Sequence, residues 1–121
     1  MLDHVGLTVG HYETSKAFYI SALAPLEYKV VMEGESWAGL GADGKPDFWI
    51  YPGKQPTQHL HLAFRSPNRA MVDAFYKAAL QAGGKDNGPP GMREIYHPNY
   101  YGAFVLDPDG NNIEAVCHDP A

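Results

Sequence analysis

Two histidines occupy equivalent places in an internal repeat of this 121-residue chain. When the chain is shifted by 57 residues, residues 2–24 (LDHVGLTVGHYETSKAFYISALA) overlay residues 59–81 (HLHLAFRSPNRAMVDAFYKAALQ) with six identities, one of which pairs His4 with His61. Such a repeat indicates one supersecondary unit used twice. A histidine duplicated on the first strand of each unit is harder to explain by packing alone, so we expect the function to involve this pair.

A carboxylate on the last predicted strand, residues 111–118 (NNIEAVCH), completes a possible ligand set. The residues that alternate with Glu114 are apolar and are expected to face a helix: Ile113, Ala115 and Cys117. Glu114 then faces the same open side as His4 and His61. Two imidazoles and one carboxylate with open positions bind divalent metals such as Fe(II) or Zn²⁺. Each residue alone is more often structural, but the repeat relation favours a metal site.

Both halves of the chain follow the order strand, helix, strand, strand, strand. In the first half these elements are predicted over residues 3–9, 13–24, 27–34, 36–42 and 47–53. In the second half they are predicted over residues 59–66, 67–82, 91–97, 100–107 and 111–118, with Ser66 capping the helix and Pro67 opening it.

The predicted fold class is therefore α+β. Two βαβββ modules form a curved mixed sheet around a cleft, with the helices on the outside. We expect one domain over residues 1–121, with modules 1–55 and 56–121 joined by the turn formers at 55–58 (QPTQ).

Composition restricts the partners. Nine basic and fourteen acidic side chains give a net charge of −5, and the cations are scattered, so no nucleic-acid surface is expected. No run approaches the roughly 20 apolar residues of a membrane span, and the opening residues do not resemble a signal peptide. Cys117 is the single cysteine, which favours a reducing compartment. We expect a cytoplasmic protein that binds a small-molecule substrate.

The segments DHVGLTV, SKAFY, HLHLAF and DPDGNNIE, in this order, resemble the vicinal oxygen chelate superfamily, which includes glyoxalase I, fosfomycin-resistance thiol transferases, extradiol dioxygenases and bleomycin-resistance proteins. The resemblance covers essentially the whole chain, and DPDGNNIE is its most specific part. It implies paired βαβββ modules with ligands on the first, fifth and eighth strands, which are His4, His61 and Glu114 here. It also implies a divalent metal ion (Fe, Zn, Ni or Mn) that chelates two adjacent substrate oxygens.

Two positions depart from the family pattern. Glyoxalase I has a fourth ligand, a glutamate on the fourth strand, and aligning Asp43-Gly44 with Asp109-Gly110 puts Phe48 opposite Glu114. Because phenylalanine can neither bind a metal nor move a proton, three ligands fit the dioxygenase and thiol-transferase branches better than isomerisation. His11 stands where many relatives carry an aspartate, and we expect it to replace that residue as the helix cap, in a structural role.

Residues 93–101 (REIYHPNYY) combine a cation, an imidazole and three phenols on a hairpin that relatives use to line the substrate cavity. His97 and Tyr101 are therefore candidates to orient substrate oxygens or to act as acid or base. The alternative is that this hairpin packs on a neighbouring subunit. Relatives of this length usually form homodimers, sometimes with exchanged modules, and the sequence leaves open whether His4 meets His61 within one chain or across two.

A second functional class is a metal-free protein that binds or sequesters a small planar compound, as bleomycin-resistance proteins do. Those relatives generally lack the two histidines and the glutamate that this chain retains. The ligand set therefore favours a metal-dependent enzyme with dioxygenase-, lyase- or transferase-like chemistry. The sequence names neither the substrate nor the metal.

Overall fold

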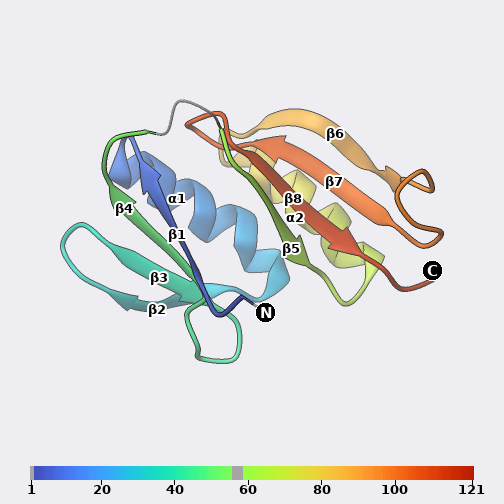
Figure 1. Ribbon diagram of the computed structural model, residues 1–121, viewed down its shortest axis with the longest axis horizontal. Helices are drawn as coiled ribbons and strands as arrows, with labels where there is room; N and C mark the ends of the chain where they lie inside the picture. The colour runs from blue at the N-terminus through green and yellow to red at the C-terminus, as the bar shows by residue number, and fades with distance from the viewer. Residues whose placement is uncertain (1, 56–58) are drawn as a thin grey trace.

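The computed structural model describes residues 2–55 and 59–121, and both halves form the predicted βαβββ module (Figure 1). The first module contains β1 (Val5–Val9), α1 (Tyr12–Leu23), the short 3₁₀ helix η1 (Ala24–Leu26), β2 (Lys29–Glu33), β3 (Ala38–Gly41) and β4 (Phe48–Pro52). The second contains β5 (His61–Arg65), α2 (Arg69–Gln81), β6 (Lys85–Met92), β7 (Tyr101–Leu106) and β8 (Asn112–Cys117). The α+β class is confirmed. Of the predicted linker 55–58, only Gln55 lies within the described residues.

Each module forms one four-stranded mixed sheet, and the strand order is the same in both: β1-β4-β3-β2 and β5-β8-β7-β6. The first and last strands of each module pair in parallel, β1 with β4 and β5 with β8, whereas all other pairs are antiparallel. The repeat in the sequence is thus a repeat in topology. It places β1 and β5, which carry or adjoin the two histidines, in equivalent positions.

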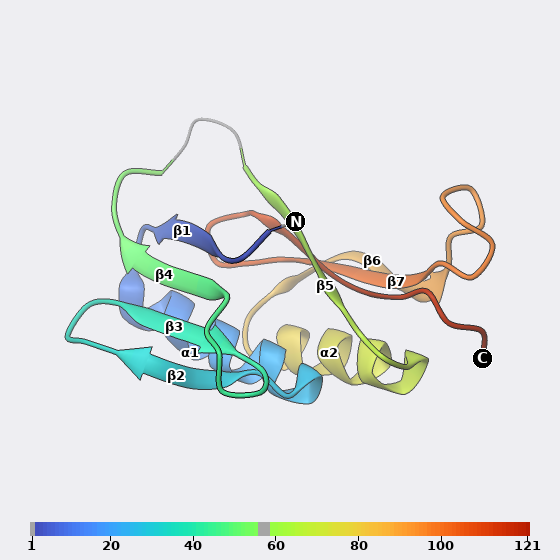
Figure 2. The ribbon, with the colours of Figure 1, turned by 60° about the horizontal axis from the view of Figure 1, so that its bottom comes forward.

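The two helices lie side by side in one layer, with β1 and the strands of the second sheet above them (Figure 2). The core lies between this helix layer and the sheets, and aromatic rings connect its two halves. Phe48 of β4 and Phe64 of β5 meet edge to face at 5.4 Å between ring centroids, a favoured aromatic geometry. Both sheets leave the face opposite the helices open. No helix of the described chain is long and apolar enough to cross a membrane.

The helix starts confirm one expectation and correct another. His11 has the predicted structural role, since its Nδ1 accepts a hydrogen bond from the Thr14 N–H at 3.3 Å and caps α1. The predicted Ser66 cap is wrong. Asn68 caps α2 by accepting from the Met71 N–H at 2.9 Å, and the Ser66 hydroxyl instead donates to the Asn68 carbonyl at 2.7 Å.

The strand predicted over 91–97 is displaced in the structure. Strand β6 covers residues 85–92, includes Pro89 and Pro90, and is followed by turns rather than by more strand. An edge strand tolerates proline because one side of its backbone needs no ladder partner. Strand β6 is such an edge: among the described strands it pairs with β7 alone, and its register shifts between Asp86 and Gly88 and again between Gly88 and Gly91.

The loop between β7 and β8, residues 107–110 (DPDG), fastens the two modules together. Asp107 is buried and accepts hydrogen bonds from two backbone N–H groups of its own loop region at 2.8 and 2.9 Å. The Tyr19 hydroxyl of α1 also donates to Asp107, and Asp109 accepts from the Gly10 N–H at 3.2 Å. The DPDG part of the DPDGNNIE segment is therefore structural, and it positions the start of β8.

Candidate metal centre

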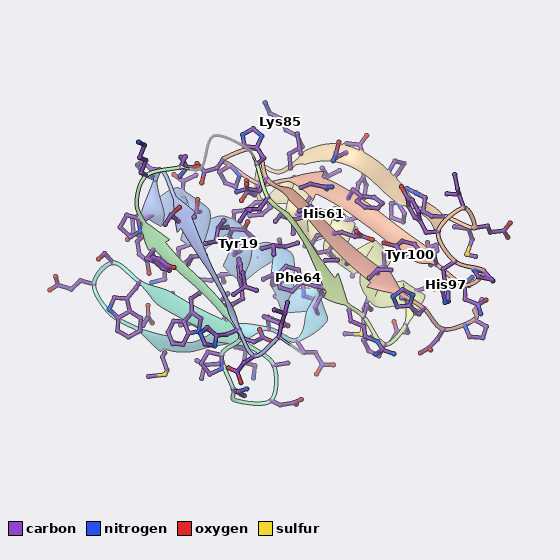
Figure 3. The ribbon with its side chains drawn as sticks, in the orientation of Figure 1. Tyr19, His61, Phe64, Lys85, His97 and Tyr100 are labelled. Atoms are coloured by element: carbon purple, nitrogen blue, oxygen red, sulfur yellow. The ribbon has the colours of Figure 1, made fainter. Side chains whose placement is uncertain are left out.

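Glu114 on β8 is a fully buried carboxylate on the open-face side of the second sheet. His61 Nε2 lies 2.8 Å from its Oε1, and the Tyr100 hydroxyl donates to its Oε2. His61 on β5 is followed by Tyr100 and His97, which lie in the segment before β7 (Figure 3). A buried carboxylate is stable only with such partners, so the fold brings together two of the three predicted ligands.

His61 contacts Glu114 with one ring nitrogen, and the rest of its side chain remains accessible. Its side chain is 55% exposed, and its ring lies 6.2 Å from that of Phe104 on β7. One imidazole nitrogen and one carboxylate are the donor types that divalent first-row metals accept. The pair therefore supplies two of the three predicted ligands of a metal site.

Tyr100 hydrogen-bonds the second carboxylate oxygen of Glu114, Oε2. Burial, followed by the hydrogen bond to Glu114, raises the pKa of the Tyr100 hydroxyl above its ordinary value. The hydroxyl therefore stays protonated at neutral pH and acts as a donor that orients Glu114.

His4 lies apart from this pair. Its Nδ1 is 2.8 Å from Asp3 Oδ1, and the other oxygen of Asp3 accepts from Lys45 Nζ at 2.8 Å. These hydrogen bonds, first from Lys45 and then from His4, lower the pKa of Asp3 to about 2. The His4 side chain is 58% exposed. Within residues 2–55 and 59–121, no three His, Cys, Asp or Glu side chains come close enough to hold a metal ion.

A hollow of about 440 Å³ runs along the seam between the start of β1 and β5, and both His4 and His61 contribute to its lining. It also contains a partly buried polar pair, in which the Tyr28 hydroxyl donates to Asp47 Oδ2 at 2.9 Å. Asp47 Oδ1 is a buried atom with no hydrogen-bond partner among the described residues. The two modules thus share this seam without bringing His4 into contact with the His61–Glu114 pair.

The position equivalent to Glu114 in the first module is Trp49, not Phe48. Strand pairing sets Ala63 opposite Glu114 and Gly6 opposite Trp49, and Gly6 and Ala63 are related by the 57-residue repeat. The expected equivalence with Phe48 is wrong by one residue, since Phe48 is buried in the core. The segment DFWIYP is too uniformly apolar for its alternation to show which residues face the open side.

An aromatic platform, defined here as Trp37, Trp49 and Tyr51, covers the open face of the first sheet. In register, Trp49 lies between Gly6 of β1 and Gly39 of β3. A side chain at either glycine would collide with a ring, because its Cβ would lie 2.3 Å from the Tyr51 hydroxyl oxygen or 2.6 Å from Trp49 Cζ3. Glycine inside a strand costs about 0.5–1 kcal/mol relative to alanine, so the backbone gives up stability to seat these rings.

The two predicted catalytic residues, His97 and Tyr101, do not share the position of Tyr100 beside Glu114. Tyr101 pairs with the buried Cys117 in the ladder, and its hydroxyl donates to Asp73 of α2 at 2.5 Å, toward the helix layer. His97 is exposed, with its ring 5.2 Å from that of His118. The tyrosine that contacts Glu114 is thus the neighbour of the predicted one. A catalytic role for His97 and Tyr101 stays a prediction.

This fold and site define a class of small-molecule-binding proteins, which has paired βαβββ modules and a histidine–glutamate pair on the open face. A comparison with protein families identifies that class. The family model of the Glyoxalase/Bleomycin resistance protein/Dioxygenase superfamily matches residues 1–115. The chain therefore belongs to this superfamily, whose members typically bind a divalent metal ion and small-molecule substrates.

Solved structures agree with this membership. A glyoxalase/bleomycin resistance protein from Albidiferax ferrireducens is 30% identical, with a TM-score of 0.82 and coverage of 98% of this chain and 99% of that one. A family enzyme from Burkholderia phytofirmans (18% identity, TM-score 0.75, 97% and 98% coverage) shares the fold. So does a lactoylglutathione lyase from Agrobacterium tumefaciens (14% identity, TM-score 0.70, 97% and 92% coverage). A comparison with curated proteins gives no match.

Proposed function

We propose that this protein is a metal-dependent enzyme that acts on a small substrate through two adjacent oxygens. The observation that carries the proposal is the buried Glu114 carboxylate, held on the open face in contact with an accessible imidazole. A carboxylate with no structural cation beside it is costly to bury. A histidine and a glutamate placed together in this way are a frequent metal or catalytic arrangement.

In this proposal His61 and Glu114 hold the ion, and Tyr100 fixes the orientation of Glu114 through its second oxygen. Partners of this kind around a metal ligand set its geometry and basicity. When bound, a divalent ion supplies a Lewis acid that two adjacent substrate oxygens can reach.

The third ligand in this proposal is His4 of a second copy of the chain. His4 and the His61–Glu114 pair lie on different sheets, and both histidine side chains are more than half exposed. The two open faces lie away from the shared helix layer (Figure 2). A twofold axis can therefore set the first sheet of one copy against the second sheet of the other, which creates two equal sites.

Trp49 favours a metal site with three protein ligands over one with four. Its position is equivalent to that of Glu114, and an indole can supply neither a metal ligand nor a transferable proton there. We therefore assign the chemistry to the dioxygenase-, lyase- or transferase-like branches rather than to isomerisation that needs a carboxylate at this position.

Calorimetric titration of chelator-treated protein with Zn²⁺, Ni²⁺ and Mn²⁺ tests the ligand assignment. We expect His61→Ala and Glu114→Gln to weaken binding by more than about tenfold, since even partners outside the ligand set cost 10–100-fold. His59→Ala, an exposed histidine two residues from His61, is the matched control and should bind as the unaltered protein does. Equal affinity in all four proteins would remove the assignment.

A metal-free binding protein is the second candidate, and a specific observation favours it. Both Glu114 oxygens already have hydrogen-bond partners in this structure, and the first sheet offers an aromatic surface beside His4. Failure of every metal to bind in the titration above, with retained binding of a small aromatic compound, would select this candidate.

A further inference from the structure

We propose that the aromatic platform binds the planar ring of an aromatic ligand, so that the substrate or ligand class of this protein is aromatic. The inference deepens the proposed function, on which it rests for the place of the ring beside His4. Its evidence is the geometry of the platform, which is independent of any metal.

The rings of the platform pack directly over glycine backbone. Trp49 on β4 has glycine on both sides in register, Gly6 on β1 and Gly39 on β3. Tyr51 covers the first glycine and the indole of Trp49 covers the second, at distances that exclude a Cβ at either position. In the second module the equivalent row is Ala63, Glu114 and Phe104. One module thus places a carboxylate where the other places an indole.

The rings form an open, rigid surface. Trp37 packs against Gly34, where a Cβ would lie 2.3 Å from its indole nitrogen. The Trp37 and Trp49 ring centroids are 6.0 Å apart, and their planes meet at 42°. Trp37 and Tyr51 are still 40% and 38% exposed. Because packed tryptophan and tyrosine rings lose little conformational freedom on binding, such a surface suits stacking with a flat ring.

The surface is concave and polar at one end. The rings line a hollow of about 640 Å³, which Asp3, His4 and Lys45 also line, and small-molecule sites typically measure about 300–1,000 Å³. Asp3 is already paired with both Lys45 and His4. The chemistry therefore fits a ligand with one planar aromatic part on the rings and a polar substituent toward His4.

Both tryptophans of the chain belong to the platform, which permits a direct test by fluorine NMR. Protein labelled with fluorinated tryptophan should give two signals, assigned with the variants Trp37→Phe and Trp49→Phe. Titration of metal-free protein in excess chelator with 2-naphthol should shift both signals to saturation. Its saturated counterpart, decahydro-2-naphthol, should bind at least about tenfold more weakly, a difference of about 1.4 kcal/mol.

Calorimetry on variants separates stacking from general apolar contact. We expect Trp49→Leu to weaken 2-naphthol binding by about tenfold and Trp49→Phe to retain most of the affinity. Gly39→Ala keeps both tryptophans but displaces the Trp49 ring, so it should weaken binding too. Tyr96→Leu removes an exposed aromatic ring from the other module and should have no effect.

Three results would overturn the proposal: equal affinity for the two naphthols, unchanged affinity in Trp49→Leu, or absence of any shift combined with a smaller sedimentation coefficient in Trp49→Leu. The last result would show that the rings pack directly against the second copy and leave no space for a ligand. Neither probe has adjacent oxygens and the protein is metal-free, so failure here leaves the metal titration intact. Loss of metal binding would equally leave this result intact.

Discussion

Glu114 is the residue on which the site depends, because it is buried and both of its oxygens are hydrogen-bonded. Tyr100→Phe removes one donor and leaves Oε2 buried without a partner. We expect the free energy of unfolding to fall by about 1–3 kcal/mol, the usual cost of an unsatisfied buried polar group, as measured by urea denaturation. Tyr96→Phe, at an exposed neighbouring tyrosine, should change it by less than about 0.5 kcal/mol. Equal losses in the two variants would contradict the role of Tyr100.

The raised pKa of Tyr19 leads us to expect a loss of stability at high pH. Burial, and then the nearby Asp107 charge, raise the pKa of its hydroxyl well above the ordinary value of 10.0. The unfolded chain therefore releases this proton first as the pH rises. Stability should be complete below about pH 10 and should decline above it.

Urea denaturation between about pH 8 and pH 11 measures this decline, since the window brackets the ordinary tyrosine pKa. Tyr19→Phe should decline less steeply, while Tyr28 and Tyr100, whose pKa values are also raised, still contribute in both proteins. Parallel curves for the two proteins would show that Tyr19 does not cause the effect.

At the level of single residues, the sequence predicted which residue types form the site better than it predicted which face of a strand each residue lies on. Alternation placed His61 and Glu114 on one face, where they meet at 2.8 Å. It could not choose between Tyr100 and Tyr101, because that choice depends on where β7 begins after the turns at 93–100. The shift from Phe48 to Trp49 has the same cause, since one residue of register exchanges the two faces of a strand.

Among the elements, the β7–β8 loop connects the two modules by hydrogen bonds with Tyr19 and Gly10. Asp107→Ala would leave the Tyr19 hydroxyl and two backbone N–H groups without their acceptor. We expect a loss of about 3 kcal/mol or more in the free energy of unfolding, since several buried donors lose a charged partner together. Urea denaturation followed by circular dichroism measures it. Asp119→Ala, near the exposed end of the chain, is the control, and a loss as small as that control's would refute the role of this loop.

The order of the elements was accessible from the sequence because alternation, turn formers and the repeat agreed. Strand β6 was not, because Gly88, Pro89 and Pro90 argue against a strand when read locally. Only its position at a sheet edge makes these residues tolerable. Helix α2 shows the same limit, since Ser66 and Asn68 are both good caps by type and the chain path decides between them.

The molecule as a whole has one covered side and one open side. Its helices pack together on the covered side (Figure 2). The open side carries the aromatic platform on one sheet and the His61–Glu114 pair on the other. The sequence could predict which residues belong to each module, because that follows from the repeat. It could not predict how two modules or two copies combine, since this depends on the packing of surfaces far apart along the chain.

The central claim is a metal site completed by two copies, and mixing two variants tests it most directly. His4→Ala and His61→Ala each lack a ligand in every site when purified alone. In a mixed dimer, the His4 of one chain can meet the His61 and Glu114 of the other. Random pairing of equal amounts should restore metal binding in about one quarter of the sites, because half of the dimers are mixed and each has one complete site of two.

Calorimetric titration of the mixture after joint refolding, against the two variants alone, gives the answer. Restoration of about one quarter of the metal-binding sites is the expected result for a twofold assembly. A mixture that binds no more metal than its separate components would contradict a site shared between two chains.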